Sequence, residues 1–136
     1  MTATSESCES NGTGVDLVEL NGKRALVTGA TGGIGGAIAR ALDACGARVA
    51  ISARREDSLQ KLAAEMGSAT ASVVCDLNDS EAAARLISRA ADSLDGTIDI
   101  LVNNAGVTKD NLALRMSEDD WRVPLDVNLT AAFILA

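Results

Sequence analysis

The segment from Thr28 to Gly35, Thr-Gly-Ala-Thr-Gly-Gly-Ile-Gly, constrains the fold of this chain more than any other. It follows an apolar stretch at 24–27 that is typical of a buried strand, and a helical pattern begins at Gly33. Glycines permit a tight turn and a close approach to a phosphate, while the next helix offers unpaired N–H groups. A second apolar strand at 49–51 completes a βαβ unit. The segment therefore predicts a pyrophosphate cradle of a dinucleotide-binding protein.

Short apolar strands alternate with helices throughout residues 21–136. The pattern predicts strands at 23–28, 48–52, 71–75 and 99–103, and helices at 33–45, 57–66 and 80–94. Gly46, Gly67 and Gly96 each follow a helical stretch, where a C-terminal cap favours positive φ. This alternation predicts the α/β class, with a Rossmann-type doubly wound parallel sheet in the order 3-2-1-4. A ligand is then expected over the C-terminal ends of strands one and four.

Residues 117–136 carry one more helical pattern. Ser117 is followed three residues later by Asp120, which resembles a capping box. An apolar stripe follows, formed by Leu125, Leu129, Ala132, Phe133 and Ala136. Pro124 disturbs this helix, because an interior proline removes a hydrogen bond and costs about 3 kcal/mol. We expect either a helix that starts later than Ser117 or one that is kinked at Pro124.

The composition excludes several classes of function. A chain of 136 residues has room for one domain. The net charge of -7 argues against binding to nucleic acid, and Trp121 and Phe133 are too few aromatic residues for a stacking platform. No apolar run has the length of a membrane span, and the N-terminus lacks the pattern of a signal peptide. We therefore expect a soluble, cytoplasmic protein with no nucleic-acid or membrane partner.

The cysteines and the N-terminal segment point to no further site. Histidine is absent, and Cys8, Cys45 and Cys75 are widely spaced, which argues against a metal site and against a disulfide framework. Cys45 and Cys75 lie in apolar surroundings and are interpreted as small core residues. Residues 1–20 are rich in Ser, Thr, Glu and Gly, contain no Lys or Arg, and are expected to form a disordered acidic tail. Residues 21–136 would then form the dinucleotide-binding part.

The expected fourth strand ends in Asn103-Asn104-Ala105-Gly106, at the point where the order of the sheet reverses. Side-chain amides at that position can hydrogen-bond both to neighbouring strand ends and to the hydroxyl groups of a ribose. Together with the glycine turn upstream, this second motif argues against the alternative of an ordinary Asn-rich turn. It predicts that the two turns form one ligand site.

Four separately placed motifs resemble the short-chain dehydrogenase/reductases. They are Thr-Gly-x-x-x-Gly-Ile-Gly at 28–35, Asp76-Leu77 after the third strand, Asn103-Asn104-Ala105-Gly106 after the fourth, and Asn128 on the last helix. The resemblance covers residues 21–136. Within that family, the segments 107–116 and 126–129 are most similar to bacterial 3-oxoacyl-acyl-carrier-protein reductases, the ketoreductases of fatty-acid biosynthesis. The resemblance implies reduction of a 3-oxoacyl thioester to the 3-hydroxyacyl thioester, with NADPH as hydride donor.

The resemblance also implies roles for individual residues. Asp76 would accept a hydrogen bond from the adenine amino group, and Leu77 would donate its backbone N–H. Asn128 would be the one catalytic residue present of the family's Asn-Ser-Tyr-Lys set, holding a water through its backbone carbonyl. The glycine turn and the Asn-rich turn would contact the pyrophosphate, nicotinamide and ribose. The implied cofactor-binding residues are Thr28, Gly29, Thr31, Gly33, Ile34, Gly35, Arg54, Asp76, Leu77, Asn103, Asn104, Ala105 and Gly106.

The choice between NAD and NADP(H) is argued from charge. An NAD site has an acidic residue at the end of the second strand for the ribose 2′-hydroxyl, whereas an NADP site needs cations for the 2′-phosphate. This chain has Arg54 and Arg55 there, so NADP(H) is predicted, with Arg54 as the first choice and Arg55 as the second. At Gly32 the chain departs from many NADPH-dependent relatives, which carry a basic residue. The alternative is that both arginines merely begin a helix in solvent.

The residues needed for turnover in this family are incomplete. The chain contains no tyrosine, and the serine and Tyr-x-x-x-Lys helix of the family would lie beyond Ala136. We therefore expect the N-terminal part of a longer reductase, truncated before the fifth strand and inactive alone, whose full-length form is a homotetramer or homodimer. The fourth strand would then form an exposed apolar edge. The alternatives are a reductase for another carbonyl, such as acetoacetyl-coenzyme A, an alcohol or a sugar, and a non-catalytic dinucleotide-binding fragment.

Overall fold

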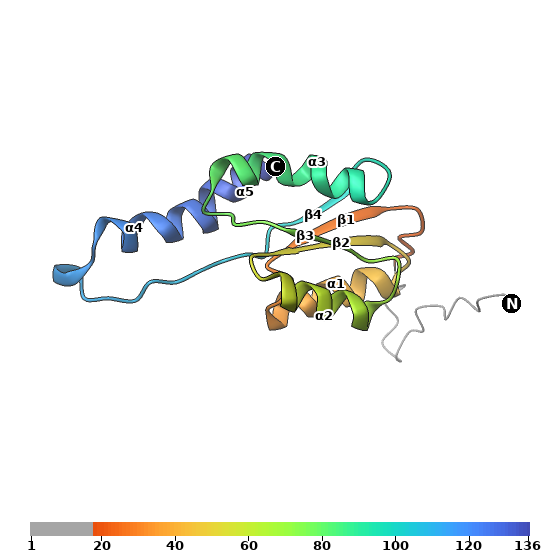
Figure 1. The fold of residues 1–136 in the computed structure, drawn as a ribbon, viewed down its shortest axis with the longest axis horizontal. Coiled ribbons are helices and arrows are strands. Elements are labelled where there is room, and N and C mark those ends of the chain that lie inside the picture. Colours follow the sequence, from red (N-terminus) through yellow and green to blue (C-terminus); the bar gives the residue numbers. More distant parts are fainter. Residues whose placement is uncertain (1–17) are drawn as a thin grey trace, which may run out of the picture.

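Residues 18–136 are described by the computed structural model, and they form a four-stranded parallel sheet with helices on both faces (Figure 1). The strands are β1 (Arg24–Thr28), β2 (Arg48–Ala53), β3 (Ala71–Val74) and β4 (Ile100–Val102). Their spatial order is β3-β2-β1-β4, and all three pairings are parallel. The predicted α/β class and the predicted order 3-2-1-4 are therefore confirmed.

The helices lie in two layers. Helices α1 (Gly33–Ala44) and α2 (Glu56–Met66) cover one face of the sheet, and α3 (Ser80–Ser93) covers the other together with α5 (Ala131–Leu135) (Figure 1). Between β4 and α5 the chain forms a 3-10 turn, η1 (Ala113–Arg115), helix α4 (Glu118–Leu125) and a π-helical turn, η2 (Asp126–Thr130). Helix α4 and the loop before it extend away from the sheet (Figure 1).

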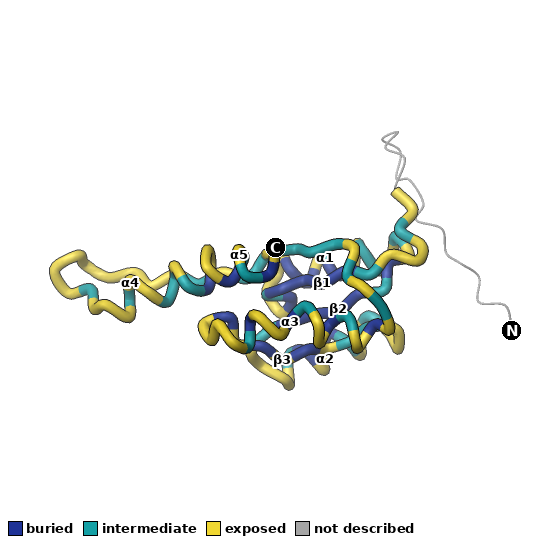
Figure 2. Tube along the Cα trace, turned by 90° about the horizontal axis from the view of Figure 1, so that it is seen from above, coloured by how far each residue is buried: buried dark blue, intermediate teal, exposed yellow. Residues whose placement is uncertain are grey.

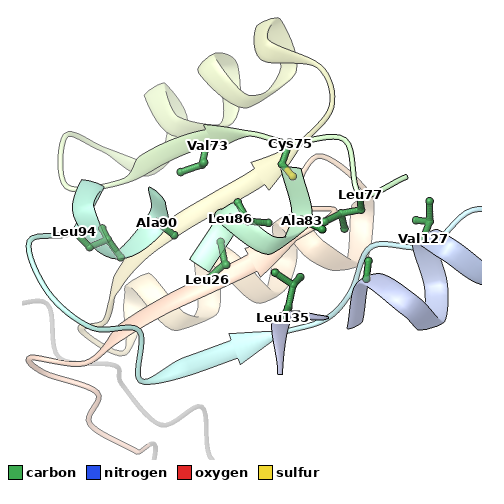
Figure 3. Packing of buried hydrophobic residues seen from close by; sticks show 12 residues of the cluster. Leu26, Val73, Cys75, Leu77, Ala83, Leu86, Ala90, Leu94, Val127 and Leu135 are labelled. Carbon is green, nitrogen blue, oxygen red and sulfur yellow. The ribbon is translucent and has the colours of Figure 1, made fainter. Parts of the chain in front are cut away.

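Two hydrophobic clusters hold these layers together. Because successive side chains of a strand point to opposite faces, Leu26 of β1 joins the cluster under α3 and α5, whereas Val27 joins the cluster under α1 and α2. Figure 3 shows the first cluster, in which Leu86 of α3 and Leu135 of α5 lie close to Leu26 of β1. Cys75 is buried in this cluster as predicted, whereas Cys45, at the C-cap of α1, is only half-buried.

The helix ends agree with the sequence at two glycines and differ at a third. Gly46 and Gly67 have positive φ, 92° and 114°, at the ends of α1 and α2. The prediction for Gly96 is wrong, because the positive φ after α3 belongs to Asp95, at 55°. A Cβ on Gly96 would instead lie 2.5 Å from Cζ of Arg24. The side chain of Arg24 donates there to the backbone oxygens of Leu94 and Asp95, so Gly96 makes room for an arginine.

The C-terminal helical segment is disturbed after Pro124, as the sequence indicates, and the disturbance takes the form of a π-helical turn. The later start is wrong, because α4 begins at Glu118, directly after the Ser117 cap, and both hydrogen bonds of the capping box with Asp120 form. Pro124 lies inside α4 and has no N–H to donate to the previous turn. The helix nevertheless continues beyond Pro124. The N–H of Asp126 donates to the backbone oxygens of Arg122 and Val123, and the helix then widens into the π-helical turn η2.

The N-terminal tail predicted for residues 1–20 is described only in part. Residues 1–17 of the expected tail lie outside the described residues. Leu20, the last residue of the expected tail, donates its N–H to the backbone oxygen of Cys45 at 2.8 Å and packs beside the cluster under α1 and α2. Among residues 18–136, none of the helices has the length and apolar character needed to cross a membrane.

Candidate dinucleotide-binding site

The glycine turn is held against the end of β2 by backbone hydrogen bonds. Ala30 N–H donates to the oxygen of Ser52 at 3.2 Å, and Gly32 N–H donates to the oxygen of Gly29 at 3.2 Å. Gly29 has a φ of 63°, which side chains with a Cβ rarely adopt. The strand β1 therefore ends in a fixed tight turn, and Gly32 becomes the N-cap of α1.

Two glycines of this turn bring a second turn into direct contact. A Cβ on Gly29 would lie 2.7 Å from the Cα of Ala105, and a Cβ on Gly35 would meet the oxygen of Gly29 and the amide nitrogen of Asn104. Gly33 differs, since a Cβ there would meet nothing within 4 Å. Gly29 and Gly35 thus serve internal packing, whereas Gly33 faces open space at the beginning of α1.

The Asn-rich turn after β4 is joined to β1 by a network of hydrogen bonds. The buried hydroxyl of Thr28 donates to the oxygen of Val102 at 3.2 Å and accepts from the N–H groups of Asn104 and Ala105, both at 3.1 Å. The side-chain amide of Asn104 donates to the backbone oxygens of Thr28 and Gly29, at 3.1 and 3.2 Å. Thr28 and Asn104 therefore fix the two turns together. The sequence predicted amide bonds from this turn to a neighbouring strand end, as Asn104 makes, but it did not indicate the role of the Thr28 hydroxyl.

The beginning of α1 offers hydrogen-bond donors to a ligand. Its N-cap is a glycine, and no side chain caps the helix. The N–H groups of the first helical turn have no partner within a helix, and the helix dipole places partial positive charge there. Thr31, Gly33 and Ile34 are exposed at this end, with Ile34 73% exposed. This arrangement suits an anionic group such as a pyrophosphate.

Two cations stand at the adjacent end of β2. Arg54 and Arg55 are exposed, and Arg55 is the N-cap of α2. Neither guanidinium forms an ion pair or a side-chain hydrogen bond with any residue in the range 18–136. Both are therefore available to a second anionic group near the glycine turn.

Asp76 and Leu77 follow β3 at the same edge of the sheet. Cys75 N–H donates to the oxygen of Ala53 at 3.0 Å, which places Asp76 beside the end of β2. The carboxylate of Asp76 accepts from Asn78 N–H at 3.0 Å, while the Leu77 side chain is buried in the core. The cap of α3 is Asp79, whose carboxylate accepts from Glu81 and Ala82. Sequence reasoning missed this cap, although Asp before a helical pattern is its usual signal.

Asn128 and Asn103 connect the Asn-rich turn to the C-terminal helices. The side-chain amide of Asn128 donates to the oxygen of Val107 at 2.9 Å, and its oxygen accepts from Val107 N–H at 2.8 Å. Asn103 donates to the oxygen of Ala132 at 3.4 Å. Asn128 lies within the π-helical turn η2, and such turns occur frequently at functional sites. It is thereby fixed next to Gly106 and Val107.

The structure thus brings all of the candidate residues to the C-terminal edge of the sheet. The glycine turn, the Asn-rich turn and the end of β2 are in direct contact, and Asp76 lies beside them. No cluster of three or more His, Cys, Asp or Glu side chains in the described part of the chain has the arrangement of a metal site. Burial raises the pKa of the Cys75 thiol, which therefore stays protonated near neutral pH. The edge thus gathers the uncapped beginning of α1, the guanidinium groups of Arg54 and Arg55 and the side-chain amides of the Asn-rich turn.

These features define the class of the protein. A parallel sheet with a glycine turn at the reversal of strand order and an uncapped helix facing it is a Rossmann-type nucleotide-binding fold.

The family follows from comparison with known sequences. A family model described as short chain dehydrogenase matches residues 23–136, and the chain belongs to that family.

Individual relatives agree with this assignment. The chain is 50% identical over 119 residues to Nodulation protein G of Rhizobium sp. (strain N33), which covers 88% of this chain and 48% of the relative. It is 46% identical over 119 residues to the 3-oxoacyl-[acyl-carrier-protein] reductase FabG of Rickettsia conorii, covering 88% and 47%. A short chain dehydrogenase from Burkholderia cenocepacia J2315, solved in complex with NADP, superimposes with a TM-score of 0.80 at 37% identity, covering 86% and 49%. The chain spans about half the length of the relatives that it matches.

Proposed function

We propose that this chain binds NADP(H) and is the cofactor-binding part of a cytoplasmic short-chain ketoreductase. The observation that carries the proposal is the contact between the glycine turn and the Asn104 turn, which leaves Gly33 facing open space at an uncapped helix end. A pyrophosphate fits there because the N–H groups of Gly33, Ile34 and Gly35 provide donors without a competing side chain. The NADP-bound relative from Burkholderia cenocepacia supports the choice of cofactor.

The preference for NADP(H) over NAD(H) is assigned to Arg54 and then to Arg55. Both are exposed beside the glycine turn and make no ion pair within the described residues. A guanidinium binds a phosphate through paired, charge-assisted hydrogen bonds. Asp76 and the backbone of Leu77 would hold the adenine, and Asn103, Asn104, Ala105 and Gly106 would line the ribose.

The proposed reaction is reduction of a 3-oxoacyl thioester carried by acyl carrier protein. Bound NADPH would supply the hydride, while the protein orients the cofactor and excludes water. Asn128 would hold a water through its backbone carbonyl, in a position fixed by its two hydrogen bonds to Val107. The 46% identity to a 3-oxoacyl-[acyl-carrier-protein] reductase supports this substrate, whereas the 50% identity to a nodulation protein leaves another carbonyl substrate as the alternative.

A second proposal concerns the 136 residues by themselves. They contain no tyrosine to act as general acid, so we expect binding of NADPH without turnover. In the full-length protein, the exposed side chains of Trp121, Leu125, Leu129 and Phe133 would be covered within a homodimer or homotetramer.

The test is a fluorescence titration of NADPH against the chain, paired with an assay for oxidation of NADPH by an acetoacetyl thioester. The expected result is saturable binding without turnover, and Arg54→Gln should weaken NADPH binding by about tenfold. Lys23→Gln, which removes a charge from the opposite end of β1, is the control. An absence of turnover in the full-length protein would exclude the ketoreductase, and an absence of binding would exclude the cofactor site.

A further inference from the structure

A hollow of about 280 Å³ opens between the glycine turn and α2, on the side of α1 away from the Asn104 turn. Polar and charged side chains of three elements line it, together with the backbone of Gly32. These side chains are Thr31 of the turn, Arg40 of α1, and Ser58, Lys61 and Glu65 of α2. None of the roles described above uses Arg40, Ser58, Lys61 or Glu65.

The side chains that line the hollow carry a net positive charge, which favours binding of an anion. The guanidinium of Arg40 and the carboxylate of Glu65 form an ion pair of 2.8 Å, so these two groups compensate each other. Lys61 has no ion pair and no hydrogen bond with any side chain from 18 to 136. Glu56 and Asp57, the acids of the first turn of α2, do not line the hollow. Lys61 is therefore its uncompensated charge.

The two arginines at the end of β2 do not line the hollow themselves, but residues close to them in the chain or in contact with their strand do. Ala30, which lines it, donates to the oxygen of Ser52, two residues before Arg54. Ser58 is three residues beyond Arg55, the N-cap of α2, so its hydroxyl lies in the first turn of that helix. Because Gly32 has no side chain, the space at this position of the turn stays open.

We propose that Lys61 supplies a further cation, beside the arginines at the end of β2, for the 2′-phosphate of NADP(H), with the hydroxyls of Thr31 and Ser58 as further donors. The turn itself has glycine at position 32 and cannot provide a cation, and Lys61 approaches the same space from α2. This inference rests on the proposed binding of NADP(H). It adds that the 2′-phosphate extends from Arg54 into the hollow.

Two ligands that differ only in the presence of the 2′-phosphate provide the test. Adenosine 2′,5′-bisphosphate carries the 2′-phosphate and adenosine 5′-monophosphate does not, so calorimetric titration of both isolates that group. Lys61→Gln should weaken binding of the bisphosphate by about tenfold and Lys61→Glu by more, because a charge-assisted hydrogen bond is lost and then a repulsion added. Binding of the monophosphate should stay within about twofold in both variants.

Lys23→Gln is the matched control, because it removes the same charge from an exposed site before β1. Equal losses for both ligands, or no loss for either in Lys61→Gln, would overturn the role of Lys61. If Arg54→Gln in that case still weakens binding of the bisphosphate more than binding of the monophosphate, the proposed function survives alone. If the unmodified chain binds neither ligand, the proposed function and this inference both fail.

Discussion

The two ends of the β4-to-α5 segment are built in opposite ways. At its beginning, Asn104 and Ala105 are locked to Thr28 and Gly29 by hydrogen bonds and by close backbone contact. Further along, much of the chain from the loop before α4 to α5 is exposed (Figure 2). Trp121, Leu129 and Phe133 lie in this region and face solvent, with Phe133 83% exposed. The first region is complete within the described residues, whereas the second packs against the core through buried Val127, Ala131 and Leu135 and partly buried Val123 and Ile134.

This difference separates the region of the proposed cofactor site from the region whose apolar side chains are exposed. The locked turns need no further element to hold the shape of the proposed cofactor site. The apolar stripe contributes little to the stability of the described residues, because its side chains are not buried. Substitutions in the two regions should therefore have very different effects on folding and on binding.

Gly29→Ala should cause the largest loss of stability. The turn holds position 29 in a left-handed conformation that costs about 1–2 kcal/mol once a Cβ is present, and the new Cβ collides with Ala105, for which overpacking adds about 1–3 kcal/mol. Urea denaturation should show a loss of about 3 kcal/mol. Gly33→Ala is the control, since its Cβ meets nothing; it should change stability by less than about 1 kcal/mol and still weaken NADPH binding. Equal stability of the two variants would refute the packing argument.

Thr28→Val should have the next largest effect. Valine fills the same volume but removes the hydroxyl that serves Val102, Asn104 and Ala105. Buried N–H groups left without an acceptor cost about 1–3 kcal/mol, so a loss of about 2 kcal/mol is expected in urea denaturation. Ser88→Ala, on the exposed face of α3, serves as the control. A stable Thr28→Val variant would show that the turns are held by packing alone.

Ser117→Ala should destabilise α4 by about 1 kcal/mol. The hydroxyl of Ser117 accepts from Asp120 N–H at 3.1 Å, and its loss leaves the first turn of the helix without a cap. Thermal denaturation followed by circular dichroism would measure the change. Ser117→Thr, which keeps the hydroxyl, should retain most of the stability, and a loss equal to that of alanine would argue against capping.

The capping box should also respond to acid. The backbone N–H and the hydroxyl of Ser117 lower the pKa of Asp120 below its usual range. A depressed carboxyl pKa contributes stability above the pKa of the unfolded chain, and this contribution is lost as pH falls through the folded value. Asp120→Asn should therefore flatten the acid limb of the stability curve. An unchanged acid limb, measured by urea denaturation between pH 2 and pH 6, would contradict this assignment.

Phe133→Ser should have the smallest effect on stability, within about 0.5 kcal/mol, because the side chain is exposed. Leu135→Ala, two residues away in the core cluster, should cost about 2–4 kcal/mol. Denaturation of both variants compares the two faces of α5 directly. A large loss in Phe133→Ser would show that the stripe is already buried in solution.

Most of the fold could be predicted because each strand and helix has its own periodic pattern. The expected strands and helices agree closely with those observed up to β4, since Gly46 and Gly67 end their helices as the pattern indicates. Gly96 was misinterpreted because its role is set by Arg24, 72 residues earlier in the chain. The π-helical turn after Pro124 was missed because a proline predicts a disturbance without its geometry.

The candidate site was predicted in its location and less well in its internal roles. The motifs placed the glycine turn and the Asn-rich turn at one edge of the sheet, because parallel strands share that edge. They allowed for amide bonds to a neighbouring strand end, as Asn104 makes, but they did not reveal that the Thr28 hydroxyl accepts from the turn, since that bond joins residues more than 70 positions apart. The hollow beside Lys61 depends on the packing of α2 against α1 and has no signal in the sequence.

The central claim is that a dinucleotide binds at the locked turns and not along the exposed stripe. Amide chemical shifts of the ¹⁵N-labelled chain, followed during titration with NADPH, test it most directly. The expected perturbations are centred on the amides of Gly33, Ile34 and Gly35, with further changes at Arg54 and Gly106. Perturbations concentrated between Trp121 and Phe133, or none at saturating NADPH, would contradict the assignment of this site.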